Sequence, residues 1–171
     1  MQDIEELKTN KFAIEYGIFT GGTGLAFAIM LYFLDAHYDN STSTQIINGT
    51  IQLVGIIIAC LAFKKANSGF ISINQALKTG VGVSLIIAIM SLIYTYLLIN
   101  FIEPDFMNKV LELSYYDTLE KYPEALASMD LNQYVENAKQ YTWFTYPAIL
   151  MFSLFFGLVE SLIVGLIIQK K

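Results

Sequence analysis

A single carboxylate interrupts an apolar stretch near the C-terminus. The run FFGLVESLIVGL, residues 155–166, holds Glu160 at its centre and contains no other ionisable side chain. Within a membrane, such a carboxyl group either donates a hydrogen bond to a neighbouring helix as a neutral acid or exchanges protons and cations. A charged acid near the centre of a bilayer costs at least about 2.5–3.5 kcal/mol on insertion scales, so we expect Glu160 to face other helices rather than lipid.

Polar side chains in the other apolar runs are candidate partners for Glu160. Counting back from Ile168 at about 1.5 Å per residue places Glu160 about 12 Å inside the end of its helix. Aligning the runs by the same ends brings five hydrogen-bonding side chains to comparable depths: Thr20, Thr23, Gln52, Ser84 and Ser91. The candidate intramembrane polar site comprises Glu160, Gln52, Ser84 and Thr23.

Small residues recur at four-residue spacing in two of these runs. They are Gly157, Ser161 and Gly165 beside the carboxylate, and Gly17 and Gly21 in the first run. Small residues on one helix face let helix backbones approach closely in a membrane. We therefore expect tight helix packing next to the candidate site.

Four long apolar runs must position these side chains. Of the 171 residues, 55% are hydrophobic, which is too apolar for one soluble domain. A membrane-spanning helix needs about 20 mostly apolar residues, and four runs approach that length: 14–34, 46–63, 80–101 and 148–168. The sequence predicts an all-α integral membrane protein, with one four-helix domain over residues 1–171. Four core helices of a soluble protein are the weaker alternative, because such helices usually carry a polar face.

The positions of the lysines predict the orientation. Basic residues close to the ends of spans favour the cytoplasmic side, and the chain has no arginine. Seven lysines fall on one side of the predicted membrane: Lys8, Lys11, Lys64, Lys65, Lys78, Lys170 and Lys171. The aromatic stretch YTWFTYP, residues 141–147, lies at the opposite end of the fourth run, as interfacial aromatic residues do. We therefore expect both termini to be cytoplasmic.

The segment between the third and fourth runs, residues 102–143, is acidic and predicted to be helical. Its first helix is expected to start after Asp105 as N-cap and to end or bend at Pro123, and a second helix is expected over residues 131–143. The result is an extracytoplasmic helical hairpin. The net charge of -5 belongs mainly to this segment and indicates a solvated face, with a bound cation or a basic partner as the alternative. It does not indicate nucleic-acid binding.

The block GFISINQALKTG, residues 69–80, resembles a block in a widespread family of small bacterial inner-membrane proteins that is catalogued only as a domain of unknown function. The matching positions are Gly69, Phe70, Ser72, Gln75, Ala76, Lys78 and Gly80. The exit of the third run resembles the family's Ile-Asp-Pro-Asp-Phe pattern, with Glu103 in place of the first aspartate. The resemblance spans nearly the whole chain and implies four helices in the bacterial inner membrane, but no activity, substrate or site.

Physically, this block is expected to form a turn followed by the first turn of the third helix, with a recognition loop as the alternative. Gly69 relaxes the backbone, Ser72 caps the helix and Lys78 extends toward headgroups. A parallel duplication is a further hypothesis, because TGGTGLAFAIML in the first run resembles TGVGVSLIIAIMSL in the third.

Two functions from different classes remain open. The first is an accessory, scaffold or assembly subunit, in which Glu160 is a protonated hydrogen-bond donor. The alternative is a small proton- or cation-coupled transporter that acts as an oligomer with Glu160 as the coupling site. The expected partners are the lipid bilayer and either a second copy or another membrane protein.

An enzyme is the weakest hypothesis. The chain has no nucleophile elbow, phosphate loop or paired cysteines, so we expect no enzymatic activity and no cofactor. Asp35, His37 and Asp39 alternate in one loop, but a single histidine at that spacing is poor evidence for a metal site, and no metal is expected.

Overall fold

The computed structural model describes residues 8–38 and 41–170, and all of its regular elements are helical. In chain order they are α1 (Thr9–Phe33), α2 (Thr42–Ala66), α3 (Ile73–Leu97), the π-helical turn η1 (Leu98–Ile102), α4 (Phe106–Lys121), the 3-10 turn η2 (Pro123–Leu126), α5 (Leu131–Lys139), the 3-10 turn η3 (Thr142–Phe144) and α6 (Thr145–Ile168). The chain divides into two compact units. Unit 1 contains the residues up to Ser91 and from Ile149 onward, and unit 2 is Leu92–Ala148.

Four helices are long and apolar enough to cross a membrane: Thr9–Phe33, Thr42–Ala66, Ile73–Ile102 and Thr142–Ile168. This confirms the four predicted runs, although the helices extend beyond their apolar parts. The second run is the shortest by hydropathy, yet α2 has 25 residues. Its ends are polar and locally stabilised, because Ser41 Oγ accepts a hydrogen bond from the Thr44 backbone N–H at 3.3 Å and two lysines occupy the last turn.

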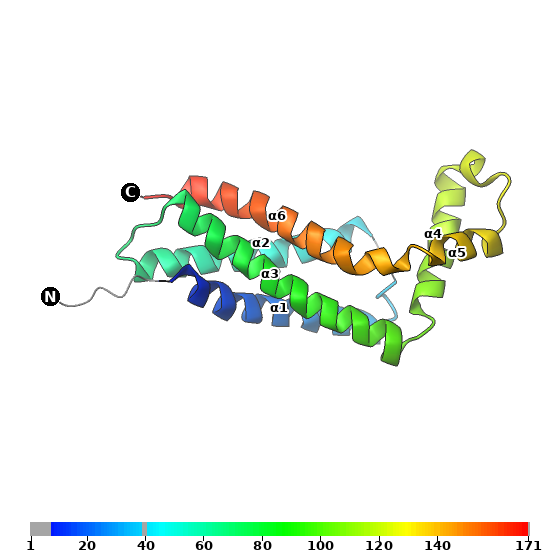
Figure 1. Ribbon diagram of the computed structural model, residues 1–171, viewed down its shortest axis with the longest axis horizontal. Helices are drawn as coiled ribbons and strands as arrows, with labels where there is room; N and C mark the ends of the chain where they lie inside the picture. The colour runs from blue at the N-terminus through cyan, green and yellow to red at the C-terminus, as the bar shows by residue number, and fades with distance from the viewer. Residues whose placement is uncertain (1–7, 39–40, 171) are drawn as a thin grey trace. The chain divides into compact units, whose positions relative to one another are not determined.

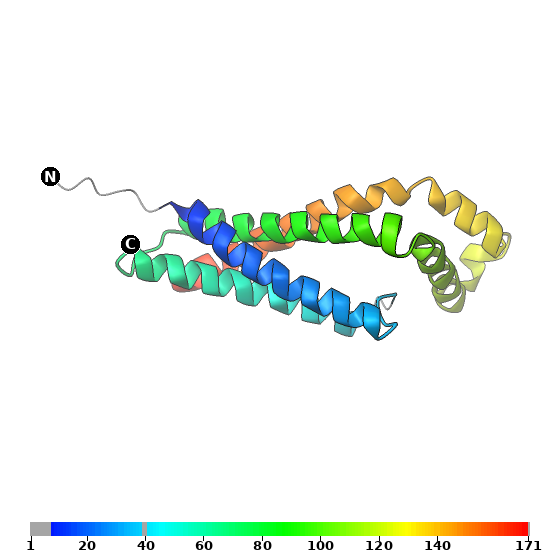
Figure 2. The ribbon, with the colours of Figure 1, turned by 90° about the horizontal axis from the view of Figure 1, so that it is seen from below.

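In unit 1 the helices lie side by side, with α1 and α3 antiparallel to α2 and α6 (Figure 1, Figure 2). One end is defined by direct contacts: Lys64 Nζ donates to the Ile168 carbonyl at 2.8 Å, and Ile71 exchanges two backbone hydrogen bonds with Lys170. We call this the lysine end because it carries Lys8, Lys11, Lys64, Lys65, Lys78 and Lys170. Lys171 lies outside the described residues.

The contact between α3 and α6 is built from glycine and serine in reciprocal positions. A Cβ added to Gly80 would overlap the Ser161 side chain, and one added to Gly157 would overlap the Ser84 side chain. Each serine hydroxyl donates to a carbonyl of its own helix: Ser84 Oγ to Gly80 O at 3.1 Å and Ser161 Oγ to Gly157 O at 2.5 Å. The polar atoms are therefore satisfied within each helix while the backbones approach closely.

The predicted small-residue packing is confirmed in the other helix contacts of unit 1. A Cβ on Gly165 would meet the Ala76 Cβ at 3.0 Å, so the α3–α6 contact continues toward the lysine end. On α1, a Cβ on Gly17 would meet the Ile86 Cβ at 2.7 Å, and a Cβ on Gly21 would lie 2.5 Å from a methionine sulfur of α3. Helices α1 and α6 therefore both use glycines to approach α3.

Unit 2 contains a helical hairpin of α4, η2 and α5. Its helices are joined by tyrosines: the Tyr134 hydroxyl lies 3.1 Å from Ser114 Oγ, and the Tyr115 hydroxyl donates to the Met129 carbonyl at 3.3 Å. The rings of Tyr115 and Tyr134 meet edge to face with centroids 5.4 Å apart. The first helix starts at Phe106 and stops before Pro123, as predicted.

Two details of the predicted hairpin were wrong. Asp105 precedes α4, but its side chain makes no capping hydrogen bond, because its backbone (φ -84, ψ 0) is not in the extended conformation that an N-cap needs. The second helix does not reach residue 143: α5 ends at Lys139 and is followed by η3. Asp130 is a true cap, since it is extended and accepts from the Gln133 N–H at 2.9 Å.

Candidate functional site: a polar cluster between three helices

Glu160 lies on α6 beside the helix face that packs into unit 1. Its neighbours Gly157 and Ser161 are buried, whereas Glu160 itself is half-buried. Gln52 on α2 points toward it, and the Gln52 Nε2 donates to Glu160 Oε2 at 3.1 Å. The carboxyl group therefore faces a side chain of another helix, and its partner is a neutral amide rather than a cation.

The Gln52 amide also connects α2 to a serine that the sequence reasoning missed. Ser153 Oγ lies 3.3 Å from Gln52 Oε1 and 3.1 Å from the Ser84 carbonyl of α3, so its one proton is shared between two acceptors. Gln52 Nε2 lies 3.5 Å from the Ser153 carbonyl. We call Glu160, Gln52, Ser153 and the Ser84 carbonyl the polar cluster. It joins α2, α3 and α6.

Ser84 contributes to the cluster only through its backbone. Its side chain is fully buried against Gly157, and its hydroxyl is used within α3. The depth of Ser84 along its helix was predicted correctly. The sequence did not show that its backbone carbonyl, rather than its hydroxyl, would accept the hydrogen bond in the polar cluster. Ser153 was detectable in the sequence, because it lies two helical turns before Glu160 and therefore on nearly the same face of α6.

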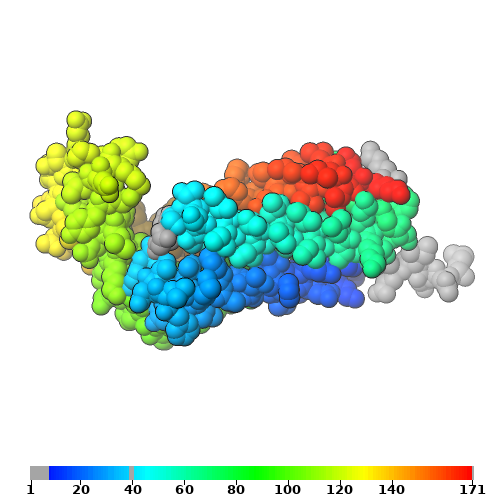
Figure 3. All heavy atoms as spheres, turned by 180° about the vertical axis from the view of Figure 1, so that it is seen from behind, coloured from blue at the N-terminus to red at the C-terminus, as the bar shows by residue number. Residues whose placement is uncertain are grey.

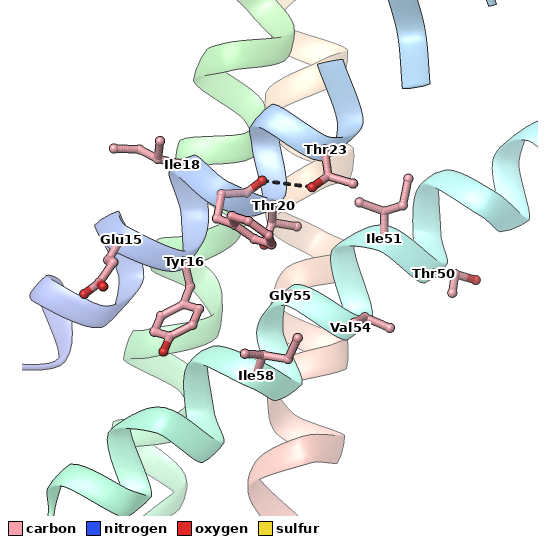
Figure 4. A pocket seen from close by; sticks show the side chains of 11 residues that line it. Glu15, Tyr16, Ile18, Thr20, Thr23, Thr50, Ile51, Val54, Gly55 and Ile58 are labelled. Carbon is pink, nitrogen blue, oxygen red and sulfur yellow. Dashed lines mark hydrogen bonds between the residues drawn. The ribbon is translucent and has the colours of Figure 1, made fainter. Parts of the chain in front are cut away.

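Thr23 does not belong to the polar cluster, so this part of the predicted site was wrong. Its hydroxyl donates to the Phe19 carbonyl of α1 at 3.1 Å, and its side chain borders a groove between α1 and α2 (Figure 4). Depth along a helix does not specify the direction in which a side chain leaves that helix. Thr23 has a comparable depth but points to a different side of unit 1.

The arrangement around Glu160 is suited to holding helices together. Only one of its two carboxyl oxygens has a hydrogen-bond partner among the described residues, and the ion pairs found there, Lys109–Glu103 and Lys121–Asp117, both lie in unit 2. An amide donor accommodates the carbonyl oxygen of a neutral acid as well as a carboxylate. The cluster therefore does not require a charged Glu160.

The block at residues 69–80 forms a turn and a capped helix start, as the turn hypothesis predicts. Gly69 has φ +87, a value that favours glycine. Ser72 and Gln75 form a reciprocal capping box: the Gln75 N–H donates to Ser72 Oγ at 3.3 Å, and the Ser72 N–H donates to Gln75 Oε1 at 2.9 Å.

The other matching positions of this block anchor or border the start of α3. Ala76 and Gly80 are buried against α6, whereas Lys78 is exposed. The Lys170 ammonium lies 5.5 Å from the centroid of the Phe70 ring. These contacts account for the block as a structural element of the lysine end.

The described residues contain no group of three or more His, Cys, Asp or Glu side chains that could hold a metal ion. Asp39, the third member of the weak candidate in the α1–α2 loop, lies outside them. The described residues of this loop therefore add no metal site in support of the enzyme hypothesis.

Comparison with known proteins identifies a family. A family model described as "Protein of unknown function (DUF4199)" matches residues 15–170, which include most of α1 and all later helices. Neither the curated proteins nor the solved structures contain a match to the chain. The resemblance drawn from residues 69–80 is thereby confirmed at the level of a family without an assigned activity.

Proposed function

The chain belongs to the DUF4199 family, and on that premise we propose that it is a non-enzymatic accessory or scaffold subunit of the bacterial cytoplasmic membrane. The observation that supports this proposal most is the polar cluster. Its hydrogen bonds connect α2, α3 and α6, and no cation takes part among the described residues. The intramembrane carboxyl group is thus used to fix helices in place, which is what a scaffold needs.

A second candidate function is supported by the carboxyl oxygen of Glu160 that does not bond Gln52. Glu160 is only half-buried, and its second oxygen has no partner in the described part of the chain, so a proton or cation has one free position there. In this alternative the protein is a proton- or cation-coupled transporter. Four helices are few for a pathway, so it would act as an oligomer, with the pathway between copies.

Glu160→Gln separates the two candidates. Glutamine keeps the shape and the oxygen that accepts from Gln52, but it has no titratable proton. Under the scaffold proposal the variant should insert, fold and assemble as the wild type does, because interhelical hydrogen bonds in membranes average only about 0.6 kcal/mol. The measurements are the elution volume in gentle detergent and proton flux into liposomes. Wild-type flux that disappears in a well-folded Gln variant would favour the transporter.

The partner is tested with the same two proteins. Affinity purification of the tagged wild type from its native membrane, followed by mass spectrometry, should recover a second membrane protein in fixed ratio. The Gln variant should recover the same protein in the same amount. Purification of copies of this chain alone would contradict the accessory role.

The lysine end is proposed to face the cytoplasm, since it gathers basic side chains that lie in or next to the ends of all four long helices. With Cys60 replaced by serine, two single-cysteine variants at exposed serines test this: Ser68→Cys beside the lysine end and Ser128→Cys in unit 2. A membrane-impermeant maleimide should label the cysteine at position 128 in intact spheroplasts and the one at position 68 only after lysis. The reverse pattern would overturn the orientation.

A further inference from the structure

A hollow of about 450 Å³ lies between α4 and α5 within unit 2. We call it the hairpin hollow. Its polar lining comes from both helices: Asn108 and Glu112 of α4, and Asn132, Glu136 and Lys139 of α5. Figure 3 shows α4 (green to yellow-green) and the turn that follows it (yellow) packed together. The hollow is therefore a feature of the helical hairpin itself.

Two carboxylates in the hairpin hollow are not neutralised by unit 2. Glu112 and Glu136 are exposed, and neither forms an ion pair or a side-chain hydrogen bond with another described residue. Lys139 lines the same hollow but pairs with neither carboxylate. The other two lysines of unit 2 are already ion-paired with other acids. The hollow thus keeps a net negative charge.

Apolar surface adjoins these carboxylates. Tyr116 lies one turn after Glu112 on the same face of α4 and is 52% exposed, and Val135 of α5 lines the hollow itself. Both helices lie outside the candidate membrane spans, so these side chains border water rather than lipid. Tyrosine is enriched in protein–protein interfaces, where its ring is covered and its hydroxyl keeps a polar partner. The surface combines negative charge with apolar area that a partner can bury.

Charge discriminates between the kinds of occupant. A second copy would bring the same acidic hairpin, since residues 102–140 contain eight acidic side chains and three lysines, and two such surfaces repel each other. Helices that lie on a membrane surface carry lysine and arginine on their polar face, and anionic lipids repel carboxylates. The described residues offer no group of three side chains for a metal ion. A basic segment of another protein is the occupant that this surface fits.

The chemistry of the hollow favours arginine over lysine in that segment. A guanidinium is planar, donates hydrogen bonds in several directions and is more weakly hydrated than an ammonium, so it can serve two carboxylates from opposite sides. It also stacks on aromatic rings, and Tyr116 presents one beside Glu112.

We propose that the hairpin hollow docks an arginine-bearing segment of a partner protein. The guanidinium enters between Glu112 and Glu136, and an apolar residue next to it covers the ring of Tyr116. This inference names the chemistry of the partner, so it rests on the accessory role proposed above.

A peptide titration of the full-length protein in mild detergent tests the proposal. The probe is a fluorescent helical peptide of leucine, alanine and glutamine with one arginine, and its control carries citrulline, which keeps the shape of arginine but has no charge. The arginine peptide should bind about fivefold more tightly, as expected for one guanidinium between two partly exposed carboxylates. This preference should disappear at high salt, because exposed ion pairs are screened.

Two double variants of equal charge test the assignment to the hollow. Glu112→Gln with Glu136→Gln should reduce the preference for the arginine peptide to near unity. Glu120→Gln with Glu124→Gln removes the same charge from exposed positions outside the hollow and should leave the preference at about fivefold. Equal losses in the two double variants would indicate only diffuse attraction to an acidic surface and overturn the proposal.

A matched pair of tryptophan variants tests the location. Asn132→Trp fills the hollow from an exposed position of α5 and should abolish the preference, whereas Gln133→Trp, at the exposed neighbour outside the hollow, should leave it unchanged. An arginine preference that Asn132→Trp leaves intact would overturn the proposal. Self-association of the protein that Asn132→Trp disrupts would overturn it in favour of a second copy.

Affinity purification separates this inference from the accessory role itself. The membrane protein that the wild type recovers in fixed ratio should be lost with Glu112→Gln and Glu136→Gln and kept with Glu120→Gln and Glu124→Gln. Undiminished recovery by the first double variant would overturn the docking surface and leave the accessory role intact. If the wild type recovers no partner, the accessory role is contradicted, and the peptide preference alone decides whether the hollow binds arginine.

Discussion

Gly157→Leu is expected to prevent the chain from forming a monodisperse four-helix protein. Even a single added carbon at this position would overlap the side chain of Ser84, which is fully buried. Overpacking a well-packed core costs about 1–3 kcal/mol and occasionally more, and leucine adds three further carbons to the overlap. Size-exclusion chromatography in mild detergent and a thermal unfolding curve measure the result. The expected outcome is aggregated protein or a strongly lowered midpoint.

Gly49→Leu is the matched control for this prediction. Gly49 lies on α2, and a Cβ there has no neighbouring atom within 4 Å, so the same substitution should leave elution and midpoint near those of the wild type. A compensating substitution at position 84 gives a second check. Gly157→Ala should lower the midpoint, and adding Ser84→Gly should restore much of it by removing the overlapping side chain. Equal effects of leucine at positions 157 and 49 would contradict the close α3–α6 contact.

Gln52→Leu is expected to destabilise the protein more than the double change of Gln52→Leu with Glu160→Leu. The single change removes the one hydrogen-bond donor that the carboxyl group has among the described residues and leaves that group without a partner there. An unsatisfied buried polar group costs about 1–3 kcal/mol, whereas replacing both partners by apolar groups is nearly neutral. Together with Glu160→Leu alone and the wild type, these variants form a double-mutant cycle. The free energy of unfolding of each of the four proteins is measured in mixed micelles.

The coupling energy of this double-mutant cycle shows whether Gln52 and Glu160 interact. A positive value, with the double variant more stable than Gln52→Leu alone, supports the hydrogen bond between α2 and α6. Ser153→Ala is a useful reference, since it removes the hydroxyl that Gln52 also contacts while leaving Glu160 paired. Strictly additive effects of the two leucine substitutions would mean that Gln52 and Glu160 do not interact.

Hydropathy predicted the existence of the four long helices but not where they end. The first apolar run begins near Ile14, whereas α1 begins at Thr9, because a helix continues through polar residues that remain at the membrane surface. The start of α4 was predictable from the periodic apolar residues after Asp105. Its capping was not, since that depends on the backbone angles of Asp105 and not on its residue type.

The polar cluster was only partly predictable for a related reason. Depth along a helix is readable from residue number, so Gln52 and Ser84 were placed at the correct level beside Glu160. The direction of each side chain depends on how every helix is rotated against its neighbours, which one sequence without a partner helix does not reveal. Thr23 was therefore included wrongly.

The alternation of glycine and serine between α3 and α6 also limits how the protein can move. Ala76, Gly80 and Ser84 of α3 face Gly165, Ser161 and Gly157 of α6, so each contact pairs a smaller residue with a larger one. Sliding α6 by one turn in either direction would bring serine against serine and glycine against glycine, creating a collision and a void together. One-turn ratcheting of helices, about 5.4 Å per step, is a common way for membrane and allosteric proteins to switch. These two helices are locked against it and must move as one body.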